Sequence, residues 1–335
     1  MKKVFNRMFL VAAIAGTGFF TACSDDDDNG NGNGNGNGNG NGAETVADVA
    51  AGNEDFSILV DALTRANLVD AVSDANANLT VFAPTNDAFT SLLGDLGLSD
   101  LDALEAALGT EGLANVLLYH VLGTKVMASD VTTGYVSSLA TNDNDNNLSM
   151  YISTSGGVSI NGSSNVVTTD IEASNGVIHV IDAVILPQTI LGLVGPNNDF
   201  DALVTAVSVA DNNPGSILDD ETSFITLFAP SNAGFDQLVS DLGAADLNDV
   251  VATVGTDGLF TVLAYHIVPA DVRSSDVQAG SVTTAAGQDF TVAIQNGNVE
   301  LTDTENRTAT VTTVDITGTN GTIHIIDNVI LPDLN

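Results

Sequence analysis

One unit of sequence occurs twice in this chain, and the repeat limits the possible fold more than any other feature. The stretch from Asp55 to Leu63 returns from Asp199 to Val207, 144 residues further along. A copy of this length is large enough to enclose its own hydrophobic core, so the repeat predicts tandem domains rather than a solenoid. The boundary falls directly after Pro187, which places the domains at 44–187 and 188–335.

Three sequence boxes occur in the same order in both copies. The first begins Phe-Ala-Pro and continues to an Asn, the second is a Tyr-His pair, and the third runs from Asn-Gly through a His to Leu-Pro. They lie at 82–89 and 228–235, at Tyr119-His120 and Tyr265-His266, and at 175–187 and 320–332.

Hydrophobic periodicity predicts the elements within each copy. In the first copy, Phe56, Leu59, Val60 and Leu63 mark one face of a helix. Helices followed by consecutive short strands indicate an α+β unit with an antiparallel sheet. Further helices are expected after a cap at Thr85 or Asn86, over 99–108 and along the stripe from Leu113 to His120, and strands over 79–82, 135–140, 148–153, 158–160, 166–171 and 177–185.

The three boxes resemble the hallmarks of the fasciclin domain, and the two copies together cover residues 44–335. The resemblance implies an α+β fold in which each of two tandem domains is a wedge-shaped antiparallel β-sandwich flanked by helices. It also implies a place on the cell surface or in extracellular matrix, and adhesion as the role most often assigned.

The N-terminus resembles the export signal of a bacterial lipoprotein. Lys2, Lys3 and Arg7 precede an apolar run that is too short to span a bilayer, and the single cysteine, Cys23, follows shortly after that run. Residues 1–22 are therefore expected to be a signal peptide and Cys23 the lipidated residue. Ordinary signal cleavage that leaves a free thiol is the alternative.

Residues 23–43 have the composition of a tether. Four aspartates follow Ser24, and seven Asn-Gly repeats come after them, with no apolar residue to build a core. The acidic run resembles the signals that send some lipoproteins to the outside of the outer membrane, and a solvated spacer is the alternative. We therefore expect the domains to be anchored to the outer membrane and to face the cell exterior.

The charge balance excludes several classes of partner. The chain has 43 Asp and Glu against 7 Lys and Arg, a formal net charge of −36. Binding of phosphates needs clustered basic residues, so nucleic acid is not expected as a partner. Contact with a membrane is expected through the lipid anchor only. An extracellular protein or polysaccharide remains as the expected partner.

The four histidines form two matching pairs, His120 with His266 and His179 with His324. A functional interpretation makes them metal ligands or general bases. A stable zinc site needs three or four protein ligands, however, and each copy offers two histidines and no cysteine. We therefore interpret these histidines, and the tyrosines that precede His120 and His266, as structural residues.

Catalytic motifs do not emerge from the sequence. The glycine-flanked elbow of a serine hydrolase and the glycine-rich phosphate loop are both missing from it. A pair of carboxylates suited to glycoside hydrolysis is kept as an alternative, because the chain contains so many Asp and Glu residues. We expect no enzymatic activity, no catalytic residues and no organic cofactor.

One loop suggests a metal site. Asp143, Asp145 and Asn147 offer side-chain oxygens at alternate positions, which resembles the start of a calcium loop. The loop lacks the glycine and the bidentate glutamate of that motif, and Asp and Asn are also the usual turn residues between strands. Calcium at this loop is therefore a hypothesis whose alternative is a solvated hairpin loop.

Binding residues are suggested by the resemblance alone. In animal fasciclin domains, an Asp-Ile pair near the last box has been linked to receptor binding, and this chain has Asp170-Ile171 and Asp315-Ile316 at the matching places. Both pairs lie in apolar segments, so burial is the competing explanation.

The function predicted from the sequence is non-catalytic adhesion at the cell surface to other cells, surfaces or extracellular polymer. A carbohydrate-binding or small-ligand-binding envelope lipoprotein is the first alternative, and the lack of Trp counts against stacking on sugars. A hydrolase is the second alternative.

Overall fold

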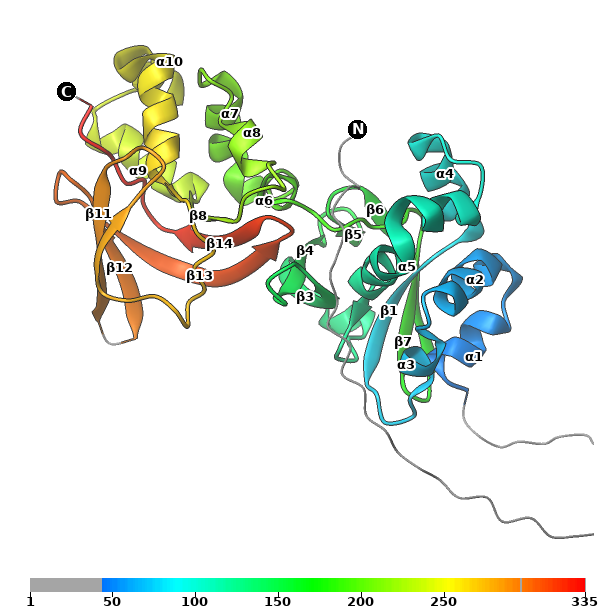
Figure 1. The fold of residues 1–335 in the computed structure, drawn as a ribbon. Coiled ribbons are helices and arrows are strands. Elements are labelled where there is room, and N and C mark those ends of the chain that lie inside the picture. The colour runs from blue at the N-terminus through cyan, green and yellow to red at the C-terminus, as the bar shows by residue number, and fades with distance from the viewer. Residues whose placement is uncertain (1–43, 296, 335) are drawn as a thin grey trace, which may run out of the picture. The chain divides into compact units, whose positions relative to one another are not determined.

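The structure, a computed structural model, describes residues 44–295 and 297–334 (Figure 1). The expected signal peptide, Cys23 and the tether lie outside the described residues. In the first domain, the chain forms helices before most of its strands. The elements are α1 (Val46–Ala51), η1 (Glu54–Phe56), α2 (Ser57–Arg65), α3 (Val69–Ser73), β1 (Leu79–Pro84), α4 (Asn86–Leu96), α5 (Leu101–Tyr119), β2 (Val121–Leu122), η2 (Ala128–Asp130), β3 (Gly134–Thr141), β4 (Asn147–Ser153), β5 (Ser159–Ile160), β6 (Ser164–Ala173) and β7 (Gly176–Ile181).

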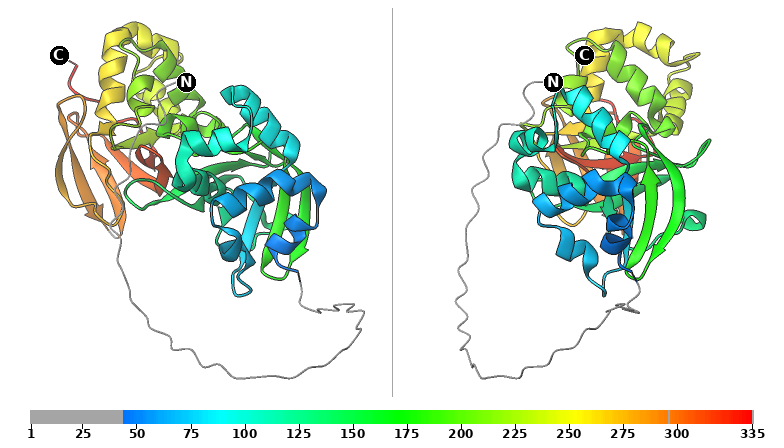
Figure 2. Two further views of the ribbon diagram at one scale, coloured as in Figure 1. Left: turned by 45° about the vertical axis from the view of Figure 1, so that its right-hand side comes forward. Right: turned by 90° about the vertical axis from the view of Figure 1, so that its right-hand side faces the viewer.

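The second domain repeats this order of elements apart from η2, which has no counterpart among its described residues. Figure 2 shows its helices gathered on one side of its strands. The elements are α6 (Ile190–Val194), η3 (Asn198–Phe200), α7 (Asp201–Val209), α8 (Gly215–Leu218), β8 (Ile225–Pro230), α9 (Asn232–Asp241), α10 (Leu247–Tyr265), β9 (Ile267–Val268), β10 (Gly280–Thr283), β11 (Asp289–Gln295), β12 (Asn298–Thr302), β13 (Thr308–Gly318) and β14 (Gly321–Ile326).

Each domain contains one seven-stranded sheet, and the expected α+β class is confirmed. The strand order is β2-β1-β7-β6-β5-β4-β3 in the first domain and β10-β11-β12-β13-β14-β8-β9 in the second. One pair in each sheet is parallel, β1 with β7 and β8 with β14, so the sheets are mixed rather than purely antiparallel. The parallel pair joins the first and last long strands of a domain, and no local sequence pattern reports such a distant pairing.

Strand β1, second from one edge of its sheet, separates two hydrophobic cores. Val81 and Ala83 face a core shared with the helices, whereas Phe82 faces a second core among the strands. Successive side chains of a strand point to opposite faces of the sheet. A strand whose residues are all buried, such as β1, therefore contacts a core on each face of the sheet. Strand β8 divides in the same way, with Leu227 on the helix side and Phe228 on the strand side.

The long strands β6 and β13 connect the two parts of each sheet. Strand β6 pairs with β5 at its start and with β7 along the rest of its length, with register shifts at Val166/Thr168 and Thr168/Ile171. Strand β13 has matching shifts. Such irregularities bend a strand and increase its twist, which lets one strand serve both layers.

Asparagines in the boxes, buried at Asn175 and half-buried at Asn86, tie distant segments together. The Asn175 side chain donates to the carbonyl oxygens of Val72 and Asp74 and accepts from the amide of Val46. Asn86 likewise accepts from the amide of Ile58 and donates to Glu54 O. Because a buried polar group costs free energy unless it is paired, these bonds fix where the helices join the sheet.

Residues of the two copies also contact each other. The Tyr135 hydroxyl donates to Leu193 O at 2.9 Å, and its side chain packs against the helix-side core of the second domain. The Thr317 amide donates to Ser149 Oγ at 3.0 Å. Strand β4 and the start of β3 therefore present polar and aromatic groups to α6 and β13.

Candidate functional site

The Tyr-His boxes are buried in both domains. His120 Nδ1 lies 2.8 Å from Val116 O, and His120 Nε2 accepts the Ile185 amide at 3.0 Å. A carbonyl can only accept, so Nδ1 carries the proton and the ring is neutral. Burial lowers the pKa of His120 to about 4. His266 has the matching bonds to Val262 O and the Ile330 amide, and burial also lowers its pKa to about 4.

The second pair of histidines anchors a loop. His179 Nε2 donates to Val126 O at 2.9 Å, while its Nδ1 accepts the Asp170 amide at 3.2 Å. His324 makes the same two bonds, to Val272 O and the Asp315 amide, and burial lowers its pKa. All four histidines therefore have both ring nitrogens occupied by backbone groups.

The Asp-Ile pairs lie at the bends of β6 and β13. Asp170 has a φ of 60°, and its Oδ1 accepts the Ala128 amide at 2.8 Å. Asp315 has a φ of 61° and accepts the Ser274 amide at 2.9 Å. Burial acts to raise the pKa of Asp315, but its hydrogen bonds from Ser274 and the nearby Arg273 lower it overall. Ile171 packs against the helix-side core, and Ile316 is buried within that of its own domain.

The acidic loop proposed for calcium contacts the second domain. The side-chain amides of Asn144 and Asn146 donate to Asp271 Oδ2, at 2.8 and 3.4 Å. Asp143 and Asp145 are exposed, and Asn147 donates to Ser138 O. Within the described residues, no group of three or more His, Cys, Asp or Glu is placed to hold a metal ion. The calcium hypothesis stays a prediction, which calorimetry of wild type and the Asp143→Ala/Asp145→Ala variant tests.

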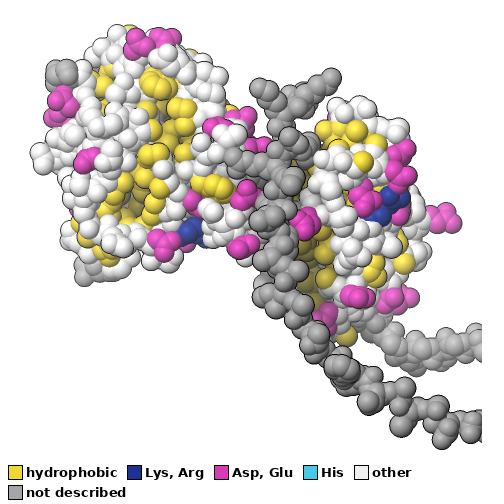
Figure 3. All heavy atoms as spheres, viewed as in Figure 1, with side chains coloured by type: hydrophobic (Ala, Val, Ile, Leu, Met, Phe, Trp, Pro, Cys, Tyr) yellow, Lys and Arg dark blue, Asp and Glu magenta, His cyan; other side chains and the backbone are white. Residues whose placement is uncertain are grey.

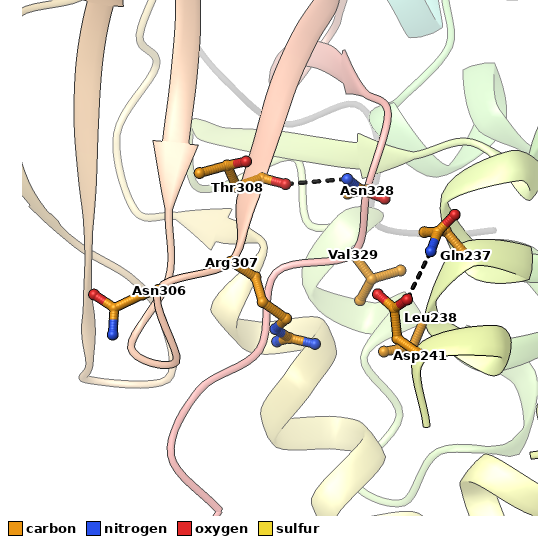
Figure 4. Close-up of a pocket in the computed structure, with 8 residues that line it drawn as sticks. All are labelled: Gln237, Leu238, Asp241, Asn306, Arg307, Thr308, Asn328 and Val329. Carbon is orange, nitrogen blue, oxygen red and sulfur yellow. Dashed lines mark hydrogen bonds between the residues drawn. The ribbon is translucent and has the colours of Figure 1, made fainter. Parts of the chain in front are cut away.

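A polar hollow in the second domain is the strongest candidate for a binding site (Figure 4). It has a volume of about 310 Å³ and lies between α9, the β12–β13 turn and the segment after β14. Its floor is apolar, from Leu238 and Val329. The remaining lining residues are all polar or charged: Gln237, Asp241, Asn306, Arg307, Thr308 and Asn328.

The hollow contains a fixed arginine. Arg307 Nη2 donates to Asp303 Oδ2 at 2.6 Å, and the Asp303 side chain is completely buried. Asp303 also accepts the backbone amides of Glu305, Arg307 and Leu331. Arg307 Nε is buried and has no hydrogen-bond partner. The guanidinium is therefore held in place by Asp303, and its Nε is shielded from solvent.

The opposite wall is also polar. Gln237 Nε2 donates to Asp241 Oδ1 at 2.6 Å, and Asn328 Nδ2 donates to Thr308 O at 3.0 Å. Figure 4 shows Arg307 reaching toward the wall that carries Asp241. Asp241 is the one carboxylate in the lining, so the hollow does not bring together the pair of carboxylates that glycoside hydrolysis uses.

Sequence reasoning did not find this hollow. The available signal was a difference between the two copies. Three lining residues of the hollow, Arg307, Gln237 and Asn328, are replaced in the first copy by Gly162, Ser91 and Ala183, respectively. The boxes are residues that the two copies share, whereas a site that belongs to one domain lies in residues that they do not share.

The surface of the described residues is acidic with scattered apolar areas. Figure 3 shows carboxylates spread as separate groups over the visible face, and hydrophobic side chains gathered in a band near α10. Over the same residues, no helix combines the length and the hydropathy needed to cross a membrane.

Comparison with known proteins gives consistent results for both copies. The model of the fasciclin domain matches residues 54–187 and 198–332. Protein sll1483 of Synechocystis is 44% identical over 43% of this chain and 74% of its own length. The transforming growth factor-beta-induced protein ig-h3 of Sus scrofa is 28% identical over 76% of this chain, which spans 35% of the pig protein.

A solved structure shares the fold of the domain pair. It is described as a FAS1 domain pair from the insect cell adhesion molecule fasciclin I. The match has a TM-score of 0.51 at 18% sequence identity and covers 81% of this chain and 95% of the insect chain. At this identity the likeness concerns the fold alone.

Proposed function

Because the chain belongs to the fasciclin domain family, we propose that it is a non-catalytic adhesion protein of the cell surface. The observation that carries the proposal is the presence of two fasciclin domains in tandem, an arrangement also found in a structure described as part of a cell adhesion molecule. The histidines and box asparagines bond to the backbone of their own domains, which leaves the outer surfaces as the places where a partner would bind.

The proposed location is the outer face of the outer membrane. Its support is the apolar N-terminal run, the single Cys23 and the acidic Asn-Gly tether, which together have the sequence pattern of a bacterial lipoprotein. Protease treatment of intact cells tests this location. Digestion of the protein is expected, and complete protection in cells whose other surface proteins are digested would rule it out.

Adhesion itself requires a test on the whole protein. The full chain is produced in a weakly adhering bacterium, and the cells retained on host cells, matrix proteins and polysaccharide coatings are counted after washing. We expect higher retention than with the Cys23→Ser variant, which is made but not anchored by lipid. Equal retention with both, when surface labelling shows the wild type displayed, contradicts the proposal.

A second candidate function is small-ligand or carbohydrate binding in the cell envelope. The hollow around Arg307 favours it, because ligand sites are concave and combine an apolar surface with a few fixed polar groups. The two candidates are compatible, since adhesion uses an outer surface and the hollow lies within the second domain.

A further inference from the structure

We propose that the hollow of the second domain binds a sugar acid, that is, a small ligand with one carboxylate and several hydroxyl groups. The inference deepens the second candidate function and does not depend on adhesion. It starts from Arg307, which lines the hollow with a partly exposed side chain whose guanidinium is fixed by Asp303.

The fixed arginine indicates the kind of ligand. The Arg307 side chain lines the hollow and is 28% exposed, so its positive charge is open to an anionic acceptor there. Carboxylates suit arginine best because their two oxygens match the geometry of adjacent guanidinium N–H groups. Asp303 already accepts the amides of Glu305 and Arg307 in its own loop and of Leu331 in the C-terminal segment, so it holds the arginine in position before a ligand arrives.

The other lining groups select hydroxyl groups. Asp241 and the side-chain oxygens of Gln237 and Asn306 accept hydrogen bonds, and the amide groups also donate. Leu238 and Val329, each 5% exposed, offer a narrow apolar floor to the C–H groups of a ring. A volume of about 310 Å³ lies at the lower end of the range for small-ligand sites, which suits a single sugar unit.

The charge of the protein limits the ligand to one or few carboxylates. The chain carries a net charge of −36, and Asp241 faces the same hollow as Arg307. A polyanion would be repelled by the whole surface as well as by this carboxylate. A ligand with one carboxylate near Arg307 and neutral hydroxyls near Asp241 avoids both sources of repulsion.

The first domain provides an internal comparison. Gly162, Ser91 and Ala183 stand there in place of Arg307, Gln237 and Asn328, so the polar groups that we assign to recognition belong to the second domain only. One binding site per chain follows from this difference.

Calorimetry on the purified full chain tests the inference, with glucuronate as the probe and glucose as the ligand that lacks the carboxylate. We expect one site per chain for glucuronate and binding of glucose at least about tenfold weaker. The Arg307→Gln variant is expected to lose most of the difference between the two ligands. Arg65→Gln is the matched control, because Arg65 forms ion pairs with Asp61, Asp102 and Glu105 outside the hollow.

A second variant covers the case in which Arg307→Gln does not fold. Gln237→Ser/Asn328→Ala installs the residues of the first copy and leaves the Arg307–Asp303 pair intact, and it is expected to weaken glucuronate about tenfold. No binding of glucuronate at millimolar concentration, equal affinity for glucose, or wild-type affinity in folded hollow variants would overturn the inference. The adhesion assay is separate, since wild-type cells that fail to adhere contradict adhesion even when calorimetry shows the site.

Discussion

The buried histidines couple stability of the fold to pH. His120 and His266 are neutral in the folded protein, and protonation would break the bond that each Nε2 accepts from a backbone amide. Their pKa falls from 6.5 to about 4 on folding, because burial disfavours the charged ring. The unfolded chain therefore binds more protons than the folded one between these two values, and stability decreases as the pH falls through this window.

We expect each of these histidines to cost about 2 kcal/mol of unfolding free energy between pH 7 and pH 5. Urea denaturation at a series of pH values measures the change, and NMR of the two rings reports their protonation directly. Ring pKa values near 6.5 in the folded protein, or stability that does not change over this window, would contradict the assignment.

Substitution of Asp170 tests whether this residue has a structural role or a binding role. Its carboxylate holds the Ala128 amide, and its positive φ disfavours most side chains other than Gly, Asn and Asp. Asp170→Ala is expected to destabilise the first domain by about 2 kcal/mol, whereas Asp170→Asn keeps an acceptor and costs less. Denaturation of both variants, with exposed Asp143→Ala as control, measures this. If Asp170→Ala is as stable as the wild type, the carboxylate of Asp170 has no structural role, and a role in binding a partner is favoured.

At the scale of elements, two positions of the second domain require glycine for different structural reasons. Gly255 interrupts α10 with a φ of 74°, and an added Cβ would meet nothing within 4 Å. Gly321 starts β14 beside β8, where an added Cβ would lie 1.9 Å from Ile225 O. The first glycine is needed for its backbone angle alone, whereas the second, with a φ of 142°, is needed both for its backbone angle and for its lack of a side chain.

We therefore expect Gly255→Ala to cost about 1 kcal/mol and Gly321→Ala about 3 kcal/mol or more, because the neighbouring strand backbone cannot move away. Thermal unfolding of the two variants compares them. A milder effect for Gly321→Ala than for Gly255→Ala would show that β8 and β14 are less closely apposed than in this structure.

Local sequence pattern predicted most elements correctly. The strands expected at 135–140 and 148–153 correspond to β3 and β4, and Thr85 caps α4 through a bond to the Ala88 amide. The break expected between the helices over 99–108 and Leu113 to His120 is the kink at Gly109 inside α5. Residues 182–185 were expected to continue a strand but lie outside β7, because they leave the sheet to meet His120.

At the scale of the whole molecule, Asp271 connects sequence copies that the repeat analysis treated as independent. It accepts from Asn144 and Asn146 of the first copy, and from Thr322 Oγ1 of its own copy at 2.6 Å. A charged acceptor shared by three donors makes this contact stronger than a single neutral hydrogen bond.

Asp271→Ala is expected to lower the unfolding free energy by about 1–2 kcal/mol and to separate the unfolding transitions of the two domains. Calorimetric unfolding of the full chain measures both effects. Asp276→Ala is the control, because Asp276 is a carboxylate of the same segment whose backbone amide bonds within its own copy, to Arg273 O. Unchanged transitions in Asp271→Ala would show that the domains do not stabilise each other here.

The sequence by itself determined the two-domain organisation, the α+β class and the order of the elements, because repeats, caps and hydrophobic periodicity are local properties of the chain. Only the tertiary structure decided which strands are parallel, that Asn144 and Asn146 face Asp271, and that Arg307 shares a hollow with Gln237 and Asn328. These features join residues that lie far apart in the chain. Their distances are set by packing of the whole domain, which no window of sequence contains.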